Sequence, residues 1–278
     1  MPRLFEARAH FIHILLFTLT FVSTLIAGAL QKGIDPIAHP DQIWRGLPFS
    51  LTLLLILGAH EFGHYYVSRK NRITVTLPYF IPAPSLIGTF GAFIKIKSPI
   101  LDRRMLLDVG VAGPLSGLIM AIPILMIGLY LSEIRLNPSD TGMTLGSSIL
   151  FYILTWIIHG NLPDKVGLIL HPMAFSGWIG LLVTAINLLP VGQLDGGHVA
   201  YAIMGTKQHN VSKFIVLSLV VLGLTTWRGW LIWAALLIIM GTQHPPVVHD
   251  WILLDERRKV IGWITLVIFI LTFTPAPF

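Results

Sequence analysis

Long apolar segments separated by short polar or Pro-containing loops dominate the chain. They lie at residues 13–30, 47–72, 102–130, 173–189, 211–241 and 260–273. Segments of this kind are typical of transmembrane helices, which need about 20 residues to cross a hydrocarbon core of about 30 Å. The fifth segment would measure about 46 Å as a single helix, so we expect two shorter spans joined by a tight turn at Arg228. The pattern therefore predicts seven transmembrane helices.

Residues 73–97 show a different pattern. The segments 73–77 and 90–97 alternate in polarity and are rich in β-branched residues, and Pro and Gly residues lie between them. This indicates strands and turns, a small membrane-associated β-hairpin. Because exposed strand edges cannot face lipid, we expect the hairpin to line a cavity or to lie at the interface. The alternative is an ordinary surface hairpin.

Residues 133–171 form the longest polar stretch, punctuated by Gly and Pro, with one apolar patch at 149–158. Ten to twelve residues are too few to span a bilayer. We therefore expect an interfacial or re-entrant helix there rather than a further span.

The composition agrees with a membrane protein. Apolar residues make up 54% of the chain and charged residues 12%, and the mean hydropathy is +0.77. The expected fold is an all-α polytopic membrane protein with a small β-hairpin, bound to lipid and not to nucleic acid. The chain has no Cys, which excludes disulfides and Cys-ligated metals, and we expect no removable signal peptide.

The distribution of positive charge predicts an orientation. With a cytoplasmic N-terminus, 14 of the 19 Lys and Arg residues fall in cytoplasmic segments, as the positive-inside rule requires. We therefore expect a multi-pass protein of the cell (inner) membrane. The sequence does not separate a bacterial membrane from an organelle membrane, and it leaves the oligomeric state open.

Two His residues and a Glu interrupt the second apolar segment. His60 and His64 are four residues apart, so they share one face of a helix and can reach one metal ion, most often zinc. Glu61 lies about 100° away, where a general base can serve a metal-bound water. The alternative, surface histidines with an accidental Glu, fits poorly because a charge inside a spanning helix is costly.

A catalytic zinc usually has three protein ligands. Asp195 is the favoured third ligand because its segment ends on the same side of the membrane as the His pair, and two glycines follow it. The other candidates are Asp102, Asp108, Glu133, His171 and His198.

Two motifs in this order resemble the site-2 protease family of intramembrane zinc metalloproteases. They are HEFGH at residues 60–64 and NLLPVGQLDG at residues 187–196. The GTFG turn at 88–91 and the AGPLSG segment at 112–117 are similar to further family elements. The resemblance covers roughly residues 51–201.

The resemblance implies roles for individual residues. His60, His64 and Asp195 would bind one Zn²⁺ per chain, and Glu61 would be the catalytic base. Asn187 would bind the substrate or polarise its carbonyl. The strand segment would receive the substrate backbone through Gly88, Thr89, Phe90 and Gly91.

These roles predict an intramembrane zinc metalloprotease that acts on single-span membrane proteins. We expect one domain over residues 1–278, with a catalytic core at about 45–205 and no appended soluble domain. The alternative is a metal or ion transporter, because intramembrane His and Asp also mark ion pathways. Substrate identity, cleavage site and trigger are not encoded in any pattern that we recognise.

Overall fold

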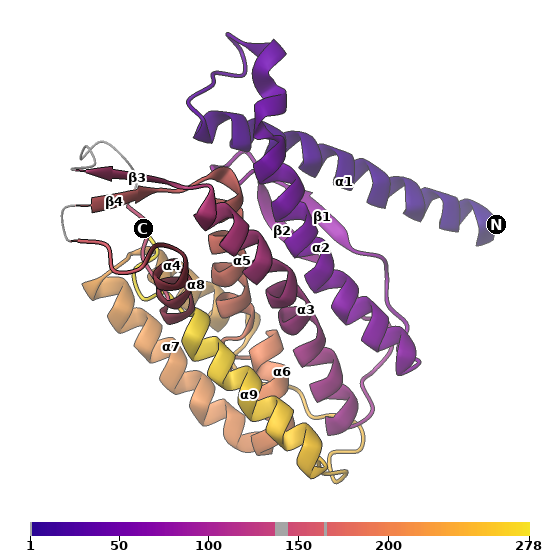
Figure 1. Ribbon diagram of the computed structural model, residues 1–278. Helices are drawn as coiled ribbons and strands as arrows, with labels where there is room; N and C mark the ends of the chain where they lie inside the picture. The colour runs from indigo at the N-terminus through magenta and orange to yellow at the C-terminus, as the bar shows by residue number, and fades with distance from the viewer. Residues whose placement is uncertain (1, 137–143, 164–165) are drawn as a thin grey trace.

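A computed structural model of the chain describes residues 2–136, 144–163 and 166–278 (Figure 1). Nine α-helices, two short 3₁₀ helices and four strands are assigned in these residues. In chain order they are α1 (Pro2–Gln31), η1 (Pro40–Gly46), α2 (Leu47–Lys70), β1 (Tyr79–Pro82), β2 (Thr89–Phe93), α3 (Arg103–Tyr130), β3 (Glu133–Leu136), α4 (Ile149–His159), β4 (Val166–Ile169), α5 (Pro172–Asn187), α6 (Asp195–Met204), η2 (Gly205–Lys207), α7 (Gln208–Thr225), α8 (Gly229–Met240) and α9 (Glu256–Thr272).

Helices α2, α3 and α5 form the centre of the molecule (Figure 1). Each of the three packs against the other two. Their shared core contains Leu53, Leu125 and Trp178, whose side chains are at most 1% exposed. This close packing holds α2, which carries the HEFGH motif, in a fixed position.

In the part of the chain that the structure describes, four helical segments are long and apolar enough to cross a membrane: His10–Gln31, Pro40–Lys70, Arg103–Tyr130 and Asp195–Thr225. The chain is therefore an integral membrane protein, but seven spans are not established. Helices α4, α5 and α8 are apolar and shorter. At 1.5 Å per residue, the 16 residues of α5 extend about 24 Å, less than the core of about 30 Å.

The predicted hairpin is present, but its first strand is displaced from the predicted position. Strand β1 pairs antiparallel with β2, and Tyr79 lies opposite Phe93. The prediction of a strand at 73–77 was wrong, since only Val75 there makes a bridge, to Ile96. The strand forms later because its aromatic rings pack on α1: Phe80 lies edge-on to Phe17, with ring centroids 5.1 Å apart.

The region between α3 and α5 holds structure that the sequence pattern did not predict. Strands β3 and β4 form a second two-stranded antiparallel sheet, with α4 between them in the chain. Residues 137–143 and 164–165 of this region lie outside the described residues. Helix α4 occupies the predicted apolar patch, and its 11 residues extend about 16 Å, less than the hydrocarbon core of about 30 Å.

The C-terminal third wraps against this centre. The break predicted near Arg228 is confirmed, because α7 ends at Thr225 and α8 begins at Gly229. Helix α9 contacts α3, α5 and α6. Arg258 of α9 fixes this contact through two hydrogen bonds to the carboxylate of Asp108 on α3, of 2.9 and 2.8 Å.

Candidate active site

Helix α2 carries three polar side chains into the protein interior. His60, Glu61 and His64 are only 4%, 6% and 7% exposed. Burying a carboxylate and two imidazoles costs free energy, so such groups inside a membrane helix usually serve a function. Their burial therefore identifies the middle of α2 as the functional centre.

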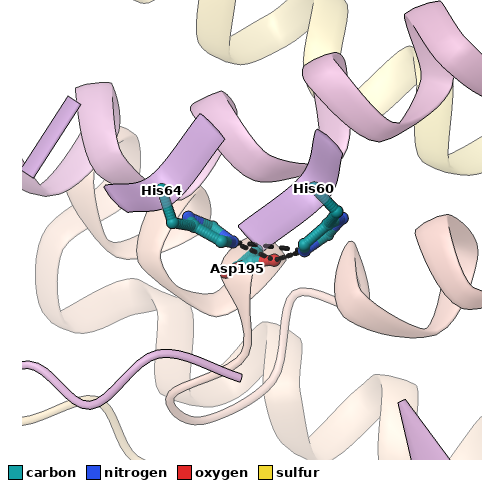
Figure 2. A group of neighbouring side chains, drawn as sticks. All are labelled: His60, His64 and Asp195. Atoms are coloured by element: carbon teal, nitrogen blue, oxygen red, sulfur yellow. Dashed lines mark hydrogen bonds and ion pairs between the residues drawn. The ribbon is translucent and has the colours of Figure 1, made fainter. Parts of the chain in front are cut away.

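The imidazoles of His60 and His64 and the carboxylate of Asp195 point toward one another (Figure 2). Nε2 of His60 and Nε2 of His64 each lie 3.2 Å from Oδ2 of Asp195, and 3.2 Å from one another. Among the described residues, these three form the group of His, Asp or Glu side chains whose ligand atoms lie within 4.8 Å of one another. The structure thus brings together the three predicted ligands.

The triangle fits zinc. A tetrahedral zinc ion bonded at about 2.0–2.1 Å separates its ligand atoms by about 3.3–3.4 Å, close to the distances found here. Nδ1 of His64 donates to the backbone carbonyl of Val109 at 2.9 Å, so Nε2 keeps its lone pair for a metal. Two imidazoles and one carboxylate are the donors of many catalytic zinc sites, and they leave a fourth position open.

Two glycines of α3 make room for the imidazoles. A Cβ added at Gly113 would overlap the ring of His64, and one added at Gly117 would lie 3.2 Å from Cβ of His60. The four-residue spacing of the glycines matches that of the histidines on the facing helix. The AGPLSG segment therefore shapes the metal site. This matched spacing was the signal in the sequence that could have revealed it.

Asp195 is the first residue of α6 and follows a tight turn after α5. A Cβ at Gly196 would collide with the carbonyl of Leu188, so the glycine after Asp195 lets the chain fold back on the end of α5. The same turn brings Asn187 to the site. Its Nδ2 lies 3.2 Å from Nε2 of His60, which places the amide beside the metal position.

Two cavities meet at this site. The metal-site cavity, of about 290 Å³, is lined by the three ligands, Glu61, Asn187 and the polar side chains of Gln193 and His198, among others. The apolar cavity, of about 300 Å³, shares His60, Glu61 and Asn187 with it and continues between aliphatic and aromatic side chains. Glu61 therefore faces both.

The β2 strand borders the apolar cavity. Thr89, Phe90 and Gly91 line it together with His60 and Glu61. Gly88 lies apart, at the turn before β2, with φ +80°. A Cβ on Gly88 would meet the backbone of Ser23 in α1. The carbonyl of Gly88 accepts a hydrogen bond from Oγ of Ser23 at 2.6 Å. Of the four residues predicted to bind substrate along the strand segment, three thus line the cavity at the site, and Gly88 positions the strand.

The other candidate ligands on α3 have structural roles. Asp102 caps α3, accepting hydrogen bonds from the backbone N–H groups of Arg104 and Met105. Asp108 forms the ion pair with Arg258, at 2.8 Å. Neither carboxylate belongs to the metal cluster.

The remaining candidates are also occupied elsewhere. Glu133 pairs with Arg135 at 3.1 Å, and the side chain of His171 caps α5. His198 lines the metal-site cavity, but its Nδ1 lies 2.8 Å from Nε2 of His244. Asp195 was preferred over these other five candidates because its segment was predicted to end on the same side of the membrane as the His pair. The geometry agrees, because Asp195 lies in the cluster with His60 and His64.

The fold and the site define a class: a helical membrane protein with a two-His, one-Asp zinc site inside the bundle. Comparison with known sequences gives the family. Residues 48–225 match the family model of peptidase family M50, the site-2 protease family, and the chain belongs to this family. The resemblance inferred from the motifs is confirmed.

Relatives from plants agree. The chain is 30% identical over 243 residues to "Probable zinc metalloprotease EGY2, chloroplastic" of Arabidopsis thaliana, covering 84% of this chain and 42% of the relative. It is 31% identical to the EGY1 protein of the same plant, covering 82% and 43%, and 28% identical to the EGY1 protein of Oryza sativa, covering 95% and 50%. The chain thus spans half or less of the length of these relatives.

Proposed function

We propose that this protein is an intramembrane zinc metalloprotease that hydrolyses peptide bonds in or near the transmembrane segments of single-span proteins. The observation that carries the proposal is the buried triangle of His60, His64 and Asp195, with Glu61 facing the same cavity. Family membership supports it, because the relatives are named zinc metalloproteases.

The residues suggest a division of labour. A bound zinc ion would lower the pKa of a water to about 7 and polarise the scissile carbonyl. Glu61 takes the proton of the attacking water and passes it to the leaving amine. Asn187, whose amide lies beside His60, donates a hydrogen bond to the carbonyl oxygen as charge develops on it.

The substrate must be extended at the point of cleavage, because a helix keeps its carbonyls in hydrogen bonds. Among the described residues, β2 pairs only with β1. Its other edge can therefore accept an extended peptide by strand addition. Thr89, Phe90 and Gly91 border the apolar cavity next to Glu61, so a peptide bound along this edge passes the base.

The proposal extends to topology. We propose seven spans, a cytoplasmic N-terminus and a metal site toward the cytoplasmic side of the cell membrane, supported by the bias of Lys and Arg. We also propose a single domain over residues 1–278 with its core at about 45–205. No observation on the described residues favours the transporter alternative, and the matched family is one of peptidases.

The decisive experiment compares wild type, Glu61→Gln, Asp195→Ala and the control Glu133→Gln. Each is co-expressed with a panel of tagged single-span proteins, and cleavage products are identified by mass spectrometry alongside zinc analysis. Gln is nearly isosteric but accepts no proton at neutral pH, so Glu61→Gln should keep about one zinc per chain and lose about 10²–10⁴-fold in rate.

The variants separate the roles. Asp195→Ala should lose zinc, and Glu133→Gln, which alters an exposed carboxylate on β3, should match wild type. Cleavage by Glu61→Gln at the wild-type rate would remove Glu61 as the base. If no protein in the panel is cleaved while metal uptake depends on His60 and His64, the protease proposal is wrong.

A further inference from the structure

The apolar cavity has a composition that the catalytic chemistry does not explain. Its floor consists of Leu53 and Leu57 of α2 together with Ile179, Leu182 and Val183 of α5, and its far wall is aromatic. Leu53, Ile179 and Leu182 are 0%, 1% and 7% exposed and belong to the central core. The floor is therefore as well packed as the rest of the bundle, and the cavity is formed before any ligand binds.

The far wall comes from a different part of the chain. Trp227, Trp233 and Phe278 complete the cavity, and all three lie beyond residue 225, where the match to the peptidase family ends. Trp227 packs edge-on against Trp230, with ring centroids 5.5 Å apart, and lies 5.6 Å from the ring of Phe278. The catalytic end of the cavity thus belongs to the shared family region, and the aromatic wall is supplied by the segment that follows.

The cavity is large enough to hold a large apolar side chain. Its volume of about 300 Å³ lies at the lower end of the roughly 300–1,000 Å³ of small-molecule sites. A peptide extended along β2 directs successive side chains to opposite faces. Because Thr89 to Ala92 line the cavity beside Glu61, the side chains on one face of the bound peptide would enter the cavity.

We propose that the apolar cavity receives the side chain of a substrate residue adjoining the scissile bond, and that it selects large apolar side chains such as Leu, Met or Phe. This inference rests on the proposed protease function. Burial of a large apolar side chain is favourable, whereas a carboxylate entering between Leu57 and Trp233 would lose its hydration without gaining a partner. The metal site defines where a bond is cut, and the aromatic wall of this chain defines which sequence is cut.

The experiment uses the full chain and a tagged single-span protein that it cleaves, with the scissile bond mapped by mass spectrometry. Ala, Leu, Phe, Trp or Asp is placed on either side of that bond. We expect wild type to prefer Leu or Phe over Ala at one of the two positions by about tenfold or more, and to reject Asp there. The ratio of rates for Phe and Ala and the ratio for Trp and Phe are the quantities compared between variants.

Two cavity variants should change the selectivity in opposite senses, one by reducing the space and one by enlarging it. Val183→Phe fills the cavity and should lower the Phe/Ala ratio by about tenfold or more. Trp233→Ala enlarges it and should raise the rate for Trp relative to Phe. Trp263→Ala is the matched control, because Trp263 is 53% exposed on α9 and lines neither cavity; it should keep the wild-type ratio.

A binding measurement completes the test. A photo-crosslinking amino acid at position 183 in the Glu61→Gln background should capture the substrate next to the scissile bond, whereas the same probe at Ile264, which is 54% exposed on α9, should not. If Val183→Phe does not accumulate, Trp233→Ala and the crosslink decide.

The outcomes separate this inference from the function on which it rests. Cleavage by wild type with unchanged ratios in both cavity variants overturns the inference and leaves the protease function intact. Failure of wild type to cleave any protein of the panel overturns both. A lower Phe/Ala ratio in Val183→Phe and a higher Trp/Phe ratio in Trp233→Ala, with a crosslink at 183 and none at 264, establish the cavity as the specificity pocket.

Discussion

At the scale of single residues, the position of His64 is constrained on three sides. Its Nδ1 donates to the carbonyl of Val109, its Nε2 points to Asp195, and Gly113 lies against its ring. Two of these contacts come from one face of α3 and the third from α6. The ring therefore has one orientation, which is what a metal ligand requires.

Gly113→Ala should weaken zinc binding. The added Cβ would overlap the His64 imidazole and force the ring away from Asp195, and we expect a loss of about 10–100-fold in zinc affinity. Gly117→Ala should have a smaller effect, because its Cβ would meet His60 at 3.2 Å. Competition with a chelator measures both.

Gly58→Ala is the control for these two variants. Gly58 is also in a helix, but a Cβ there would meet only the ring of Phe80, at 4.0 Å. It should bind zinc as wild type does. Equal zinc affinity in Gly113→Ala and Gly58→Ala would show that the glycine at 113 is not needed for the site.

The ligands were predictable from the sequence and their surroundings were not. The i, i+4 spacing places His60 and His64 on one helix face, and helix order places Asp195 on the same side. The contact of Gly113 with His64 depends on how α2 and α3 are aligned, which only tertiary packing determines. A small residue in a spanning helix indicates a close neighbour, but it does not say which side chain that neighbour is.

At the scale of elements, the boundaries of β1 show what a local pattern misses. The β-branched segment at 73–77 has the stronger strand propensity, yet β1 forms at Tyr79–Pro82. The ring centroid of Tyr79 lies 4.1 Å from that of His13 and 5.4 Å from that of Phe93. These contacts with α1 and β2 outweigh local propensity, which is only a weak indicator for strands.

The loop between α8 and α9 is fastened to the bundle through Asp250. Its carboxylate accepts hydrogen bonds from Nε and Nη2 of Arg103, at 2.9 and 2.6 Å, and from the hydroxyl of Tyr201 at 3.1 Å. The hydrogen bonds from Arg103 are the main cause that holds the pKa of Asp250 below its usual value, with a smaller contribution from Tyr201. The loop is thereby anchored to both α3 and α6.

Asp250→Asn should lower the melting temperature by a few degrees at pH 7. Because the pKa of the folded state is depressed, the stabilisation is present above the unfolded value of about 3.9 and is lost as the pH falls through the folded value. The difference from wild type should therefore shrink at acidic pH. Thermal unfolding at several pH values measures it.

Asp41→Asn provides the comparison, since Asp41 is an exposed aspartate at the start of η1. It should unfold at the wild-type temperature. A gap for Asp250→Asn that is the same at pH 7 and at a pH well below the unfolded pKa of about 3.9 would mean that the charge of Asp250 is not what fastens the loop.

At the scale of the whole molecule, α7 and α8 determine the number of spans. Helices α7 and α8 pack against each other on either side of the break at residues 226–228. If both span the membrane, Arg228 lies on the outer side and Lys207, at the other end of α7, on the inner side. The length of α8, 12 residues, makes this arrangement worth a direct test.

Arg228→Cys introduces a single Cys, because the natural chain has none. If residue 228 lies on the outer side, this Cys should react with a membrane-impermeant thiol reagent in intact cells. A Cys at position 207 should react only after the cells are opened. Mass-tag gel shifts measure both. Protection of position 228 in intact cells would contradict the seven-span arrangement.

The metal-site cavity also has a consequence for the products of the proposed reaction. In the proposed function each hydrolysis would consume one water and create an ammonium and a carboxylate, and neither group is stable in hydrocarbon. Gln193, an exposed side chain that lines this cavity, gives the cavity a polar edge at which water can enter. The new charged ends would be hydrated at that edge, so rejoining them would require their dehydration. Under the proposed function, the cavity would therefore make cleavage of a membrane-embedded chain a one-way step, driven by the hydration of the ends it creates.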